Sequence, residues 1–442
     1  MKTARELALI TLDACARGGA WAGSYLSDAV LSEEMDARES ALALRLCYGV
    51  LQNRALLDFY LSHFCTSPYR RLEEQVRNCL RIGAYQLLFL DKIPSSAAVN
   101  ESVNLAKKYG RNPRAPGLVN AILRTLDRNR DKLPELPSED PEAYLALKYS
   151  HPEWFVKELC LMLGSEGAEQ FLAADNAETP SLLQINTLRT TATETEKQMK
   201  AQKANIRPHS WLKDCLELRE GGRLERYGAF SEGAFWVQDA AARLSVLAAS
   251  PEPGWNVLDT CSAPGGKSFA AALDMENQGK ITACDIHPRK LRMVEEGAAR
   301  LGLTCIETCI QDAGAQKRDW ANVFDLVIAD LPCSGFGVIR KKPDIRYRPK
   351  ELLAGLPGLQ CALLDNVSGY VRPGGVLLYS TCTVFSRENE DVVHNFLKMH
   401  TDFSLEAFHL PGPAGMAEKG YITLWPHLHE TDGFFIAKMR KK

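Results

Sequence analysis

The segment "VLDTCSAPGGKSFAAAL" (Val257–Leu273) decides the fold of the C-terminal half. An apolar run typical of a buried strand ends at Asp259, a loop with two adjacent glycines follows, and a helix-like apolar stretch comes next. Ligands bind at the carboxyl ends of strands in parallel α/β sheets, and glycines there let a ligand approach the backbone closely. The segment therefore predicts a strand–loop–helix unit with a binding loop at its centre.

Alternating strands and helices extend this unit over residues 236–442. Short β-rich runs such as "KITACDI" (280–286), "FDLVIAD" (324–330) and "GVLLYST" (375–381) are separated in several places by stretches with helical spacing. This alternation predicts a Rossmann-like α/β domain, with a parallel sheet and helices on both faces. The run "DGFFIAKMRK" (432–441) is expected to add a final antiparallel strand at the edge.

The first 235 residues predict two further domains. Residues 1–138 keep apolar side chains at three- and four-residue spacing, which predicts an all-helical domain. Three prolines among charged residues in 131–143 are typical of a linker. Residues 139–235 are interpreted as this linker and a small α+β unit with a strand–helix–strand order.

Composition excludes several classes of protein. The chain is 45% hydrophobic and 24% charged with a net charge of −2, which is ordinary for a globular protein. No apolar run approaches the roughly 18 residues that a membrane span needs. The 13 cysteines include no C-x-x-C pair, so neither a disulfide scaffold nor a zinc site is expected. We expect a cytoplasmic protein without metal and, since no coiled-coil pattern is present, a monomer.

Four strand-like runs of the C-terminal half end at or just before an acidic residue: Asp259, Asp285, Asp312 and Asp330. The glycine loop is neither G-x-G-x-x-G nor a Walker pattern, so adenosine with a nonphosphate arm, S-adenosyl-L-methionine, fits better than a dinucleotide or a triphosphate. Asp285 is expected to hold the ribose hydroxyls, Asp312 the adenine edge, and Asp330 to lie near the donor. The predicted cofactor-binding residues are Cys261, Ser262, Ala263, Pro264, Gly265, Gly266, Lys267, Asp285, Asp312 and Asp330.

Two cysteines stand where strands leave the predicted sheet. Cys333 lies in "DLPCSG" and Cys382 in "YSTCTV", whereas a methyltransferase acting on exocyclic amines would be expected to show two prolines at the first place. A cysteine beside a methyl donor favours carbon methylation, because a thiolate that adds to C6 of a pyrimidine makes C5 nucleophilic. Spacing alone leaves open which of the two thiols attacks.

Three segments resemble the signature motifs of the Sun/NOP2 family of RNA cytosine-C5 methyltransferases: "DTCSAPGGK", "DLPCSGFGVIRKKPDIRY" and "YSTCTVFSRENE". The segments "AVNESVNLAKKYG" and "GLVNAILR" resemble the helical NusB-like domain of one bacterial branch, so the resemblance covers nearly the whole chain. It implies a NusB-like N-terminal domain, a class I methyltransferase domain and action on small-subunit (16S) ribosomal RNA.

The resemblance also assigns roles to residues. It implies that Cys382 is the nucleophile, that Cys333 assists product release, and that Lys267 positions the base edge. Asp330 is expected to anchor the cytosine as well as lie near the donor. The family loop commonly has Ala-Ala where this chain has Cys261-Ser262, and since both pairs are small, close backbone approach is expected to survive.

Two basic segments are candidate RNA contacts. Lys107–Lys132 holds eight Lys or Arg against two Asp, and Arg340–Lys350 holds six against one, with Tyr347 among them. Phosphate neutralisation favours the first as a docking face, and the second is expected to guide single-stranded RNA toward the site. Two alternatives stay open at this point: a DNA C5 methyltransferase that attacks through Cys333, and an RNA-binding protein with a vestigial catalytic half.

Overall fold

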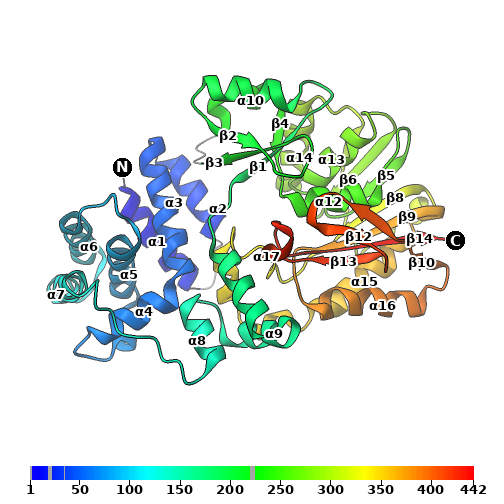
Figure 1. The fold of residues 1–442 in the computed structure, drawn as a ribbon. Helices are drawn as coiled ribbons and strands as arrows, with labels where there is room; N and C mark the ends of the chain where they lie inside the picture. The colour runs from blue at the N-terminus through cyan, green and yellow to red at the C-terminus, as the bar shows by residue number, and fades with distance from the viewer. Residues whose placement is uncertain (1, 18–21, 34, 220–223) are drawn as a thin grey trace. The chain divides into compact units, whose positions relative to one another are not determined.

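The computed structural model describes residues 2–17, 22–33, 35–219 and 224–442 (Figure 1). The chain divides into two compact units, residues 1–177 with 339–348, and residues 178–338 with 349–442. We call them the helical unit and the sheet unit. Among the described residues, no helix combines the length and the apolar character that crossing a membrane requires.

The helical unit forms because its apolar residues recur every three or four positions and share one core. Leu7, Leu46, Leu80 and Leu123 from four different helices are all buried in that core. Asp36 begins one of these helices by accepting hydrogen bonds from the backbone N–H groups of Arg38 and Glu39. The helices are α1 (Ala4–Ala16), α2 (Ala22–Ser32), α3 (Ala37–Gln52), α4 (Arg54–His63), α5 (Glu74–Phe89), α6 (Ser95–Tyr109), α7 (Ala115–Arg128), α8 (Pro141–Lys148) and α9 (Glu153–Asn176).

Residues 339–348 belong to the helical unit although they follow the Pro-Cys motif in the chain. Arg346 is only 1% exposed. Its Nη1 donates to the backbone oxygens of Gln52 (2.9 Å), Ser150 (3.0 Å) and Tyr149 (3.3 Å), and its Nη2 donates to Asn176 Oδ1 (3.1 Å). One guanidinium therefore joins the end of α3, the loop after α8 and the end of α9.

The burial of Arg346 corrects one prediction from the sequence. The basic segment Arg340–Lys350 is expected from the sequence to face RNA, but the guanidinium of Arg346 donates its hydrogen bonds to backbone carbonyls of its own unit. Burial lowers the pKa of its guanidinium, which nevertheless lies 3.8 Å from the carboxylate of Asp175. Arg346 is thus a packing residue of the helical unit and is closed to solvent.

A small antiparallel sheet opens the sheet unit. It contains β1 (Ser181–Ile185), β2 (Asn205–Pro208), β3 (Cys215–Arg219) and β4 (Phe235–Val237) in the order β2-β3-β1-β4. Helix α10 (Ala192–Ala201) begins with a capping box between Thr191 and Glu194, and buries Met199 against the sheet. The predicted α+β middle unit is confirmed. Strand β4 crosses the predicted boundary at residue 235. The three predicted domain limits stay a prediction.

The larger sheet has eight strands. Its parallel part follows the order β9-β8-β5-β6-β7, and β14, β10 and β13 continue it in antiparallel fashion beyond β9. The strands are β5 (Asn256–Asp259), β6 (Lys280–Asp285), β7 (Ile306–Ile310), β8 (Phe324–Asp330), β9 (Val371–Thr381), β10 (Phe403–Leu405), β13 (Tyr421–Leu424) and β14 (Phe434–Lys441). The predicted Rossmann-like fold is confirmed.

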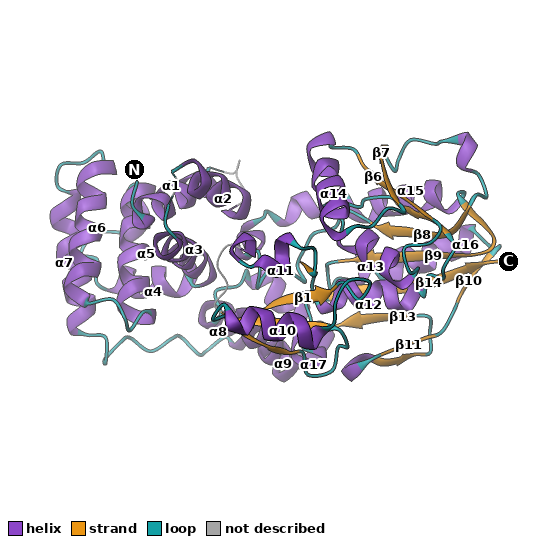
Figure 2. Cartoon of the chain, turned by 90° about the horizontal axis from the view of Figure 1, so that it is seen from above, coloured by secondary structure: helices purple, strands orange, loops and turns teal. Residues whose placement is uncertain are grey.

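Alternating side chains send each strand's apolar residues to two separate cores. Val257 and Ile328 face a core with α12 (Ala240–Ala249), α13 (Gly266–Asp274) and α14 (Pro288–Leu301). Leu258 and Val327 face the opposite core with α15 (Leu356–Ser368) and α16 (Glu390–Met399). Figure 2 shows α14 alongside β6 and β7. The remaining short elements are α11 (Gly228–Ser231), β11 (Phe408–Leu410), β12 (Gly415–Ala417) and α17 (Pro426–His429).

Strand β14 corrects a second prediction. The run at 432–441 does form an antiparallel strand, but it does not lie at the edge, because it pairs with β9 on one side and with β10 and β13 on the other. Its residues Phe434 to Met439 are all buried. The physical reason for its place is that β10 and β13 pair with the backbone of β14 on the side away from β9.

Replacement of Arg346 tests how the helical unit holds the inserted segment. We expect Arg346→Ala to lower the free energy of unfolding by about 3 kcal/mol, because several buried carbonyls lose their donor. Urea unfolding followed by circular dichroism measures the change. Lys342→Ala, at an exposed position of the same segment, is the control and is expected to change stability by less than about 0.5 kcal/mol. Equal stability of the two variants would contradict the account.

Candidate active site

The carboxyl ends of four neighbouring parallel strands meet at one edge of the sheet. Asp259 ends β5, Asp285 ends β6, Asp330 ends β8, and Thr381 ends β9. The chain leaves β5 for β6 on one side and later returns to β8 on the other, so the strand order reverses between β5 and β8. In open α/β sheets ligands bind at such a reversal.

Two hydrogen bonds and one glycine turn fix the conformation of the glycine loop. Ser262 donates from its N–H (2.7 Å) and its hydroxyl (3.0 Å) to the backbone oxygen of Cys284 on β6. Gly265 has φ +111°, and a Cβ there would lie 2.3 Å from the Phe269 ring. Only glycine fits this turn, and helix α13 begins directly after it. The loop therefore presents backbone where the sequence predicts a cofactor.

Asp259 lies buried beneath this loop at 1% exposure. Its Oδ2 accepts a hydrogen bond from the Ser268 hydroxyl at 2.7 Å. Burial raises the pKa of its carboxyl to about 6, although this hydrogen bond and the Lys267 charge act in the opposite direction. Through Ser268, Asp259 supports the start of the helix that follows the loop, and its carboxyl changes protonation state near pH 6.

Lys267, Asp330 and Ser380 form a connected group. Lys267 Nζ lies 2.6 Å from Asp330 Oδ2, and the Ser380 hydroxyl donates to Asp330 Oδ1 at 2.7 Å. Burial acts to lower the pKa of Lys267, but the Asp330 carboxylate more than offsets it, so that the pKa is raised and the ammonium stays charged. The carboxylate explains how a lysine is tolerated in the first turn of α13.

The two cysteines predicted from the sequence meet at the same edge. Cys333 Sγ and Cys382 Sγ are 3.1 Å apart, and the Cys382 N–H donates to Cys333 Sγ at 3.3 Å. The hydrogen bond with Cys382, and burial after it, raise the pKa of the Cys333 thiol well above its usual range. Cys333 is therefore a neutral thiol in this arrangement. The structure thus brings Cys382, Cys333, Asp330 and Lys267 into one site.

Glu388 holds the two cysteine loops together, and the sequence reasoning missed it. Its Oε2 accepts from the Ser334 N–H (2.8 Å) and from Gln360 Nε2 (3.0 Å), and the Ser334 hydroxyl donates to Thr383 Oγ1 (2.8 Å). Glu388 is fully buried. The position of Glu388 close to the Thr-Cys motif could have indicated this role. A carboxylate buried near the motif needs hydrogen-bond donors, and a neighbouring segment can supply them. Ser380 was missed in the same motif.

The remaining predicted cofactor residues lie at the same edge. Asp285 Oδ1 accepts from the His287 N–H (2.9 Å), and Asp312 Oδ1 accepts from the Gly314 N–H (2.8 Å). Among the described residues, the second oxygen of each carboxylate accepts no hydrogen bond, which leaves it for a ligand hydroxyl or amine. Burial raises the pKa of Cys261 to about 12, so this small residue of the loop is neutral.

A doubly wound sheet with a glycine loop after its first parallel strand and acids at successive strand ends defines a class I methyltransferase domain. Comparison with known proteins agrees. Residues 246–440 match the family model of 16S rRNA methyltransferases RsmB/F, residues 2–128 match the NusB family, and residues 151–225 match the ferredoxin-like domain of RsmF/B-like methyltransferases.

Full-length relatives extend this finding. The chain is 36% identical over 445 residues to "Probable ribosomal RNA small subunit methyltransferase B" of Bacillus subtilis, with 99% of this chain and 98% of the relative covered. It is 32% identical to "Ribosomal RNA small subunit methyltransferase B" of Vibrio cholerae, with 95% and 94% covered. The solved structure of PH0851 has the same fold, with a TM-score of 0.83, 24% identity and coverage of 100% and 99%.

The chain belongs to the RsmB/F family of 16S rRNA methyltransferases, a family of S-adenosylmethionine-dependent enzymes. The resemblance seen in the sequence is thereby confirmed, as are the NusB-like N-terminal domain and the methyltransferase domain. The middle α+β unit has the ferredoxin-like fold.

The pKa of Asp259 gives a prediction for stability against pH. The folded-state pKa of about 6 lies above the ordinary value of 3.8. The folded protein therefore binds this proton more tightly, and the resulting stability is present below the ordinary value and is lost as the pH rises through about 6.

Asp259→Asn removes this titration. Relative to the variant, the wild type is expected to lose roughly 3 kcal/mol of unfolding free energy between about pH 4 and pH 7, and nothing further above that. Urea unfolding of both proteins across this range measures the difference. Parallel pH profiles of the two proteins would show that Asp259 titrates normally.

Proposed function

We propose that this protein transfers a methyl group from S-adenosyl-L-methionine to C5 of a cytosine in 16S ribosomal RNA through a covalent Cys382–C6 adduct. The observation that carries the proposal is the pair of thiols 3.1 Å apart beside the Lys267–Asp330 pair. Methyl transfer to an exocyclic amine needs no thiol, whereas methylation of C5 needs a nucleophile at C6. Two cysteines from separate strand ends supply one group to attack and one to assist release.

The cofactor fits the residues around the loop. S-adenosyl-L-methionine supplies an electrophilic methyl group on its sulfonium. The loop Cys261–Lys267 offers backbone atoms at close range, because Gly265 leaves no side chain in the turn. Asp285 would accept from the ribose hydroxyls and Asp312 from the adenine amine, each with its remaining carboxylate oxygen. Asp330 stands between this loop and the cysteines.

Lys267 and Asp330 prepare the base for attack in the proposed mechanism. The Lys267 ammonium interacts electrostatically with Cys382, and a nearby positive charge favours the thiolate of a cysteine. Asp330, held by Lys267 and Ser380, would accept a hydrogen bond from the cytosine amine, and the Lys267 ammonium would stabilise the negative charge that develops on the ring. Both groups are fixed before the base arrives, so no reorganisation is needed.

The bond changes balance in three steps. The Cys382 thiolate forms a bond to C6, and the electron pair of the C5–C6 double bond shifts onto the ring. C5 then takes the methyl group, and the sulfonium becomes a neutral thioether. A base removes the C5 proton, the C5–C6 double bond returns and Cys382 leaves C6 as a thiolate. Cys333, a neutral thiol in contact with Cys382 Sγ, would stabilise the departing sulfur by donating its proton toward it.

The substrate part of the proposal rests on the relatives and on the family. Two relatives that match almost the whole chain bear the name ribosomal RNA small subunit methyltransferase B. A cytosine must leave its stack for attack at C6, so an unpaired segment of the RNA is the expected target. We further propose that the protein acts as a monomer in the cytoplasm, where its 13 free cysteines stay reduced.

Formation of 5-methylcytidine tests the proposal. Wild-type protein, S-adenosyl-L-methionine and 16S rRNA from a strain that lacks this modification are expected to give 5-methylcytidine, detected by mass spectrometry of the digested RNA. Cys382→Ser is expected to lower the rate by about 1,000-fold or more, because the nucleophile is lost. Cys361→Ser, a change at a half-buried cysteine of α15, is the matched control and should leave the rate unchanged. Methylation of DNA but not of this RNA, or full activity of Cys382→Ser, would overturn the proposal.

A further inference from the structure

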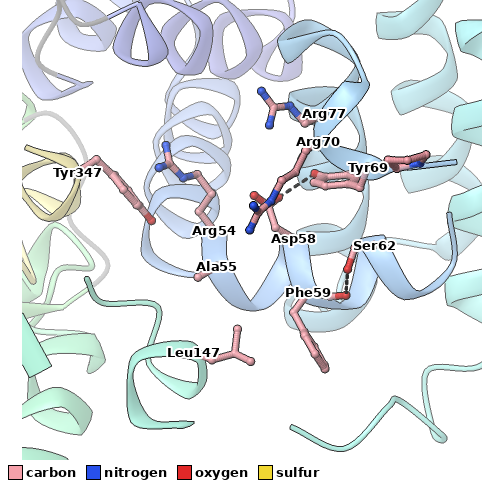
Figure 3. A pocket seen from close by; sticks show the side chains of 11 residues that line it. Arg54, Ala55, Asp58, Phe59, Ser62, Tyr69, Arg70, Arg77, Leu147 and Tyr347 are labelled. Atoms are coloured by element: carbon pink, nitrogen blue, oxygen red, sulfur yellow. Dashed lines mark hydrogen bonds between the residues drawn. The ribbon is translucent and has the colours of Figure 1, made fainter. Parts of the chain in front are cut away.

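The helical unit contains a pocket whose lining residues are separate from those of the methyltransferase site. Its volume is about 740 Å³, and three arginines, three aromatic rings and one aspartate are among the side chains that line it (Figure 3). Tyr347, from the segment that follows the Pro-Cys motif, forms part of its wall. The other lining residues are Arg54, Ala55, Asp58, Phe59, Ser62, Pro68, Tyr69, Arg70, Arg77 and Leu147.

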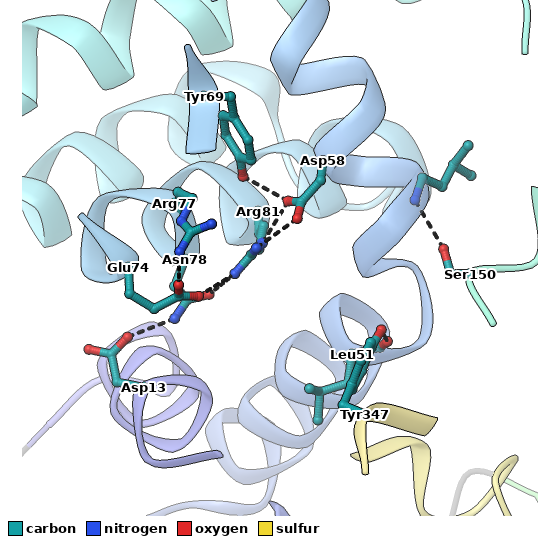
Figure 4. A network of polar contacts seen from close by, with 11 residues as sticks. Asp13, Leu51, Asp58, Tyr69, Glu74, Arg77, Asn78, Arg81, Ser150 and Tyr347 are labelled. Carbon is teal, nitrogen blue, oxygen red and sulfur yellow. Dashed lines mark hydrogen bonds and ion pairs between the residues drawn. The ribbon is translucent and has the colours of Figure 1, made fainter. Parts of the chain in front are cut away.

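The charge of the pocket is positive because its acids are already paired. Asp58 accepts from Arg81 Nε and Nη2 and from the Tyr69 hydroxyl, each at 2.7 Å (Figure 4). Arg81 is 3% exposed and also binds Glu74, which in turn pairs with Arg77. Four arginines thus stand against two carboxylates in this cluster. Arg54 and Arg70 form no ion pair with any described residue, so their charges remain for a ligand.

The rings and guanidinium groups suit an unpaired nucleotide. The Arg54 guanidinium lies 3.5 Å from the centre of the Tyr347 ring, which fixes it as a flat platform. Unstacked bases of RNA pack against such guanidinium planes and against aromatic side chains, and Phe59 and Leu147 add apolar surface to the wall. Arg70 is exposed at the pocket, and arginine forks match phosphate oxygens.

We propose that this pocket binds one unpaired nucleotide of the RNA substrate, with its phosphate on Arg70 and its base against Arg54. The proposal rests on the function proposed above, since it takes the ligand to be the same RNA. Segment 339–348 supports this choice: Tyr347 follows Cys333 by 14 residues in the chain, and Arg346 anchors the segment beside the pocket. RNA held there would contact the chain segment that continues from the catalytic loop.

The test compares RNA binding by pocket variants. We expect Arg54→Ala/Arg70→Ala to weaken binding of unmodified 16S rRNA by 10-fold or more in a filter assay at physiological salt. Loss of one phosphate contact is also expected to lower the slope of log K against log salt by about 0.7. Affinity for S-adenosyl-L-methionine and kcat at saturating RNA should not change. Arg38→Ala, which removes an exposed arginine outside the pocket, is the control and should bind as the wild type does.

The outcomes distinguish failure of the pocket proposal from failure of the proposed methyltransferase function. Unchanged RNA affinity and salt slope in the double variant and in Arg70→Ala would overturn the pocket. Arg70→Ala guards against a folding defect, because this side chain is exposed and forms no hydrogen bond or ion pair with any described residue. If the wild type binds this RNA but does not methylate it, the proposed function fails while loss of binding in the variants still supports the pocket. If the wild type does not bind the RNA, the pocket inference fails as well.

Discussion

The parallel pairing of β8 with β9 is the constraint on which the proposed catalytic site depends. It places Asp330 opposite Ser380, and the loops that follow these residues carry Cys333 and Cys382. The Ser380 hydroxyl and Lys267 then hold the two oxygens of Asp330, and Glu388 ties the two loops together. Each of these polar groups hydrogen-bonds another in a partly buried place, and these bonds hold Asp330 and the two loops in position.

Much of this arrangement was predictable because strand ends are visible in the sequence. Apolar runs that end in Asp259, Asp285 and Asp330 fix where a parallel sheet opens to a ligand, and two cysteines after strands must then approach the same edge. That a cysteine beside a methyl donor indicates carbon methylation follows from the chemistry of C5 of a pyrimidine, and not from the spacing of the cysteines in the sequence. Which cysteine attacks was implied only by family resemblance, because both stand at equivalent places on neighbouring strands.

The failures have physical reasons as well. Strand β14 lies inside the sheet, since two short strands, β10 and β13, cover its outer edge, and nothing in its own residues announces them. Arg346 belongs to a basic run that is typical of an exposed RNA contact, but it is buried, and it donates to backbone carbonyls from two separate segments and to the side chain of Asn176 in a third. Glu388 serves as an acceptor for groups 28 and 54 residues away in the chain. Contacts of this kind depend on the tertiary fold, which local patterns do not contain.

A covalent trap tests the two-cysteine account most directly. Cys333→Ala protein incubated with S-adenosyl-L-methionine and unmodified 16S rRNA is expected to accumulate a protein–RNA adduct that survives denaturation, because attack proceeds while release is impaired. The adduct should vanish in Cys333→Ala/Cys382→Ala. An adduct that persists in the double variant, or no adduct with the single variant while the wild type methylates the same RNA, would contradict the assignment of attack to Cys382 and release to Cys333.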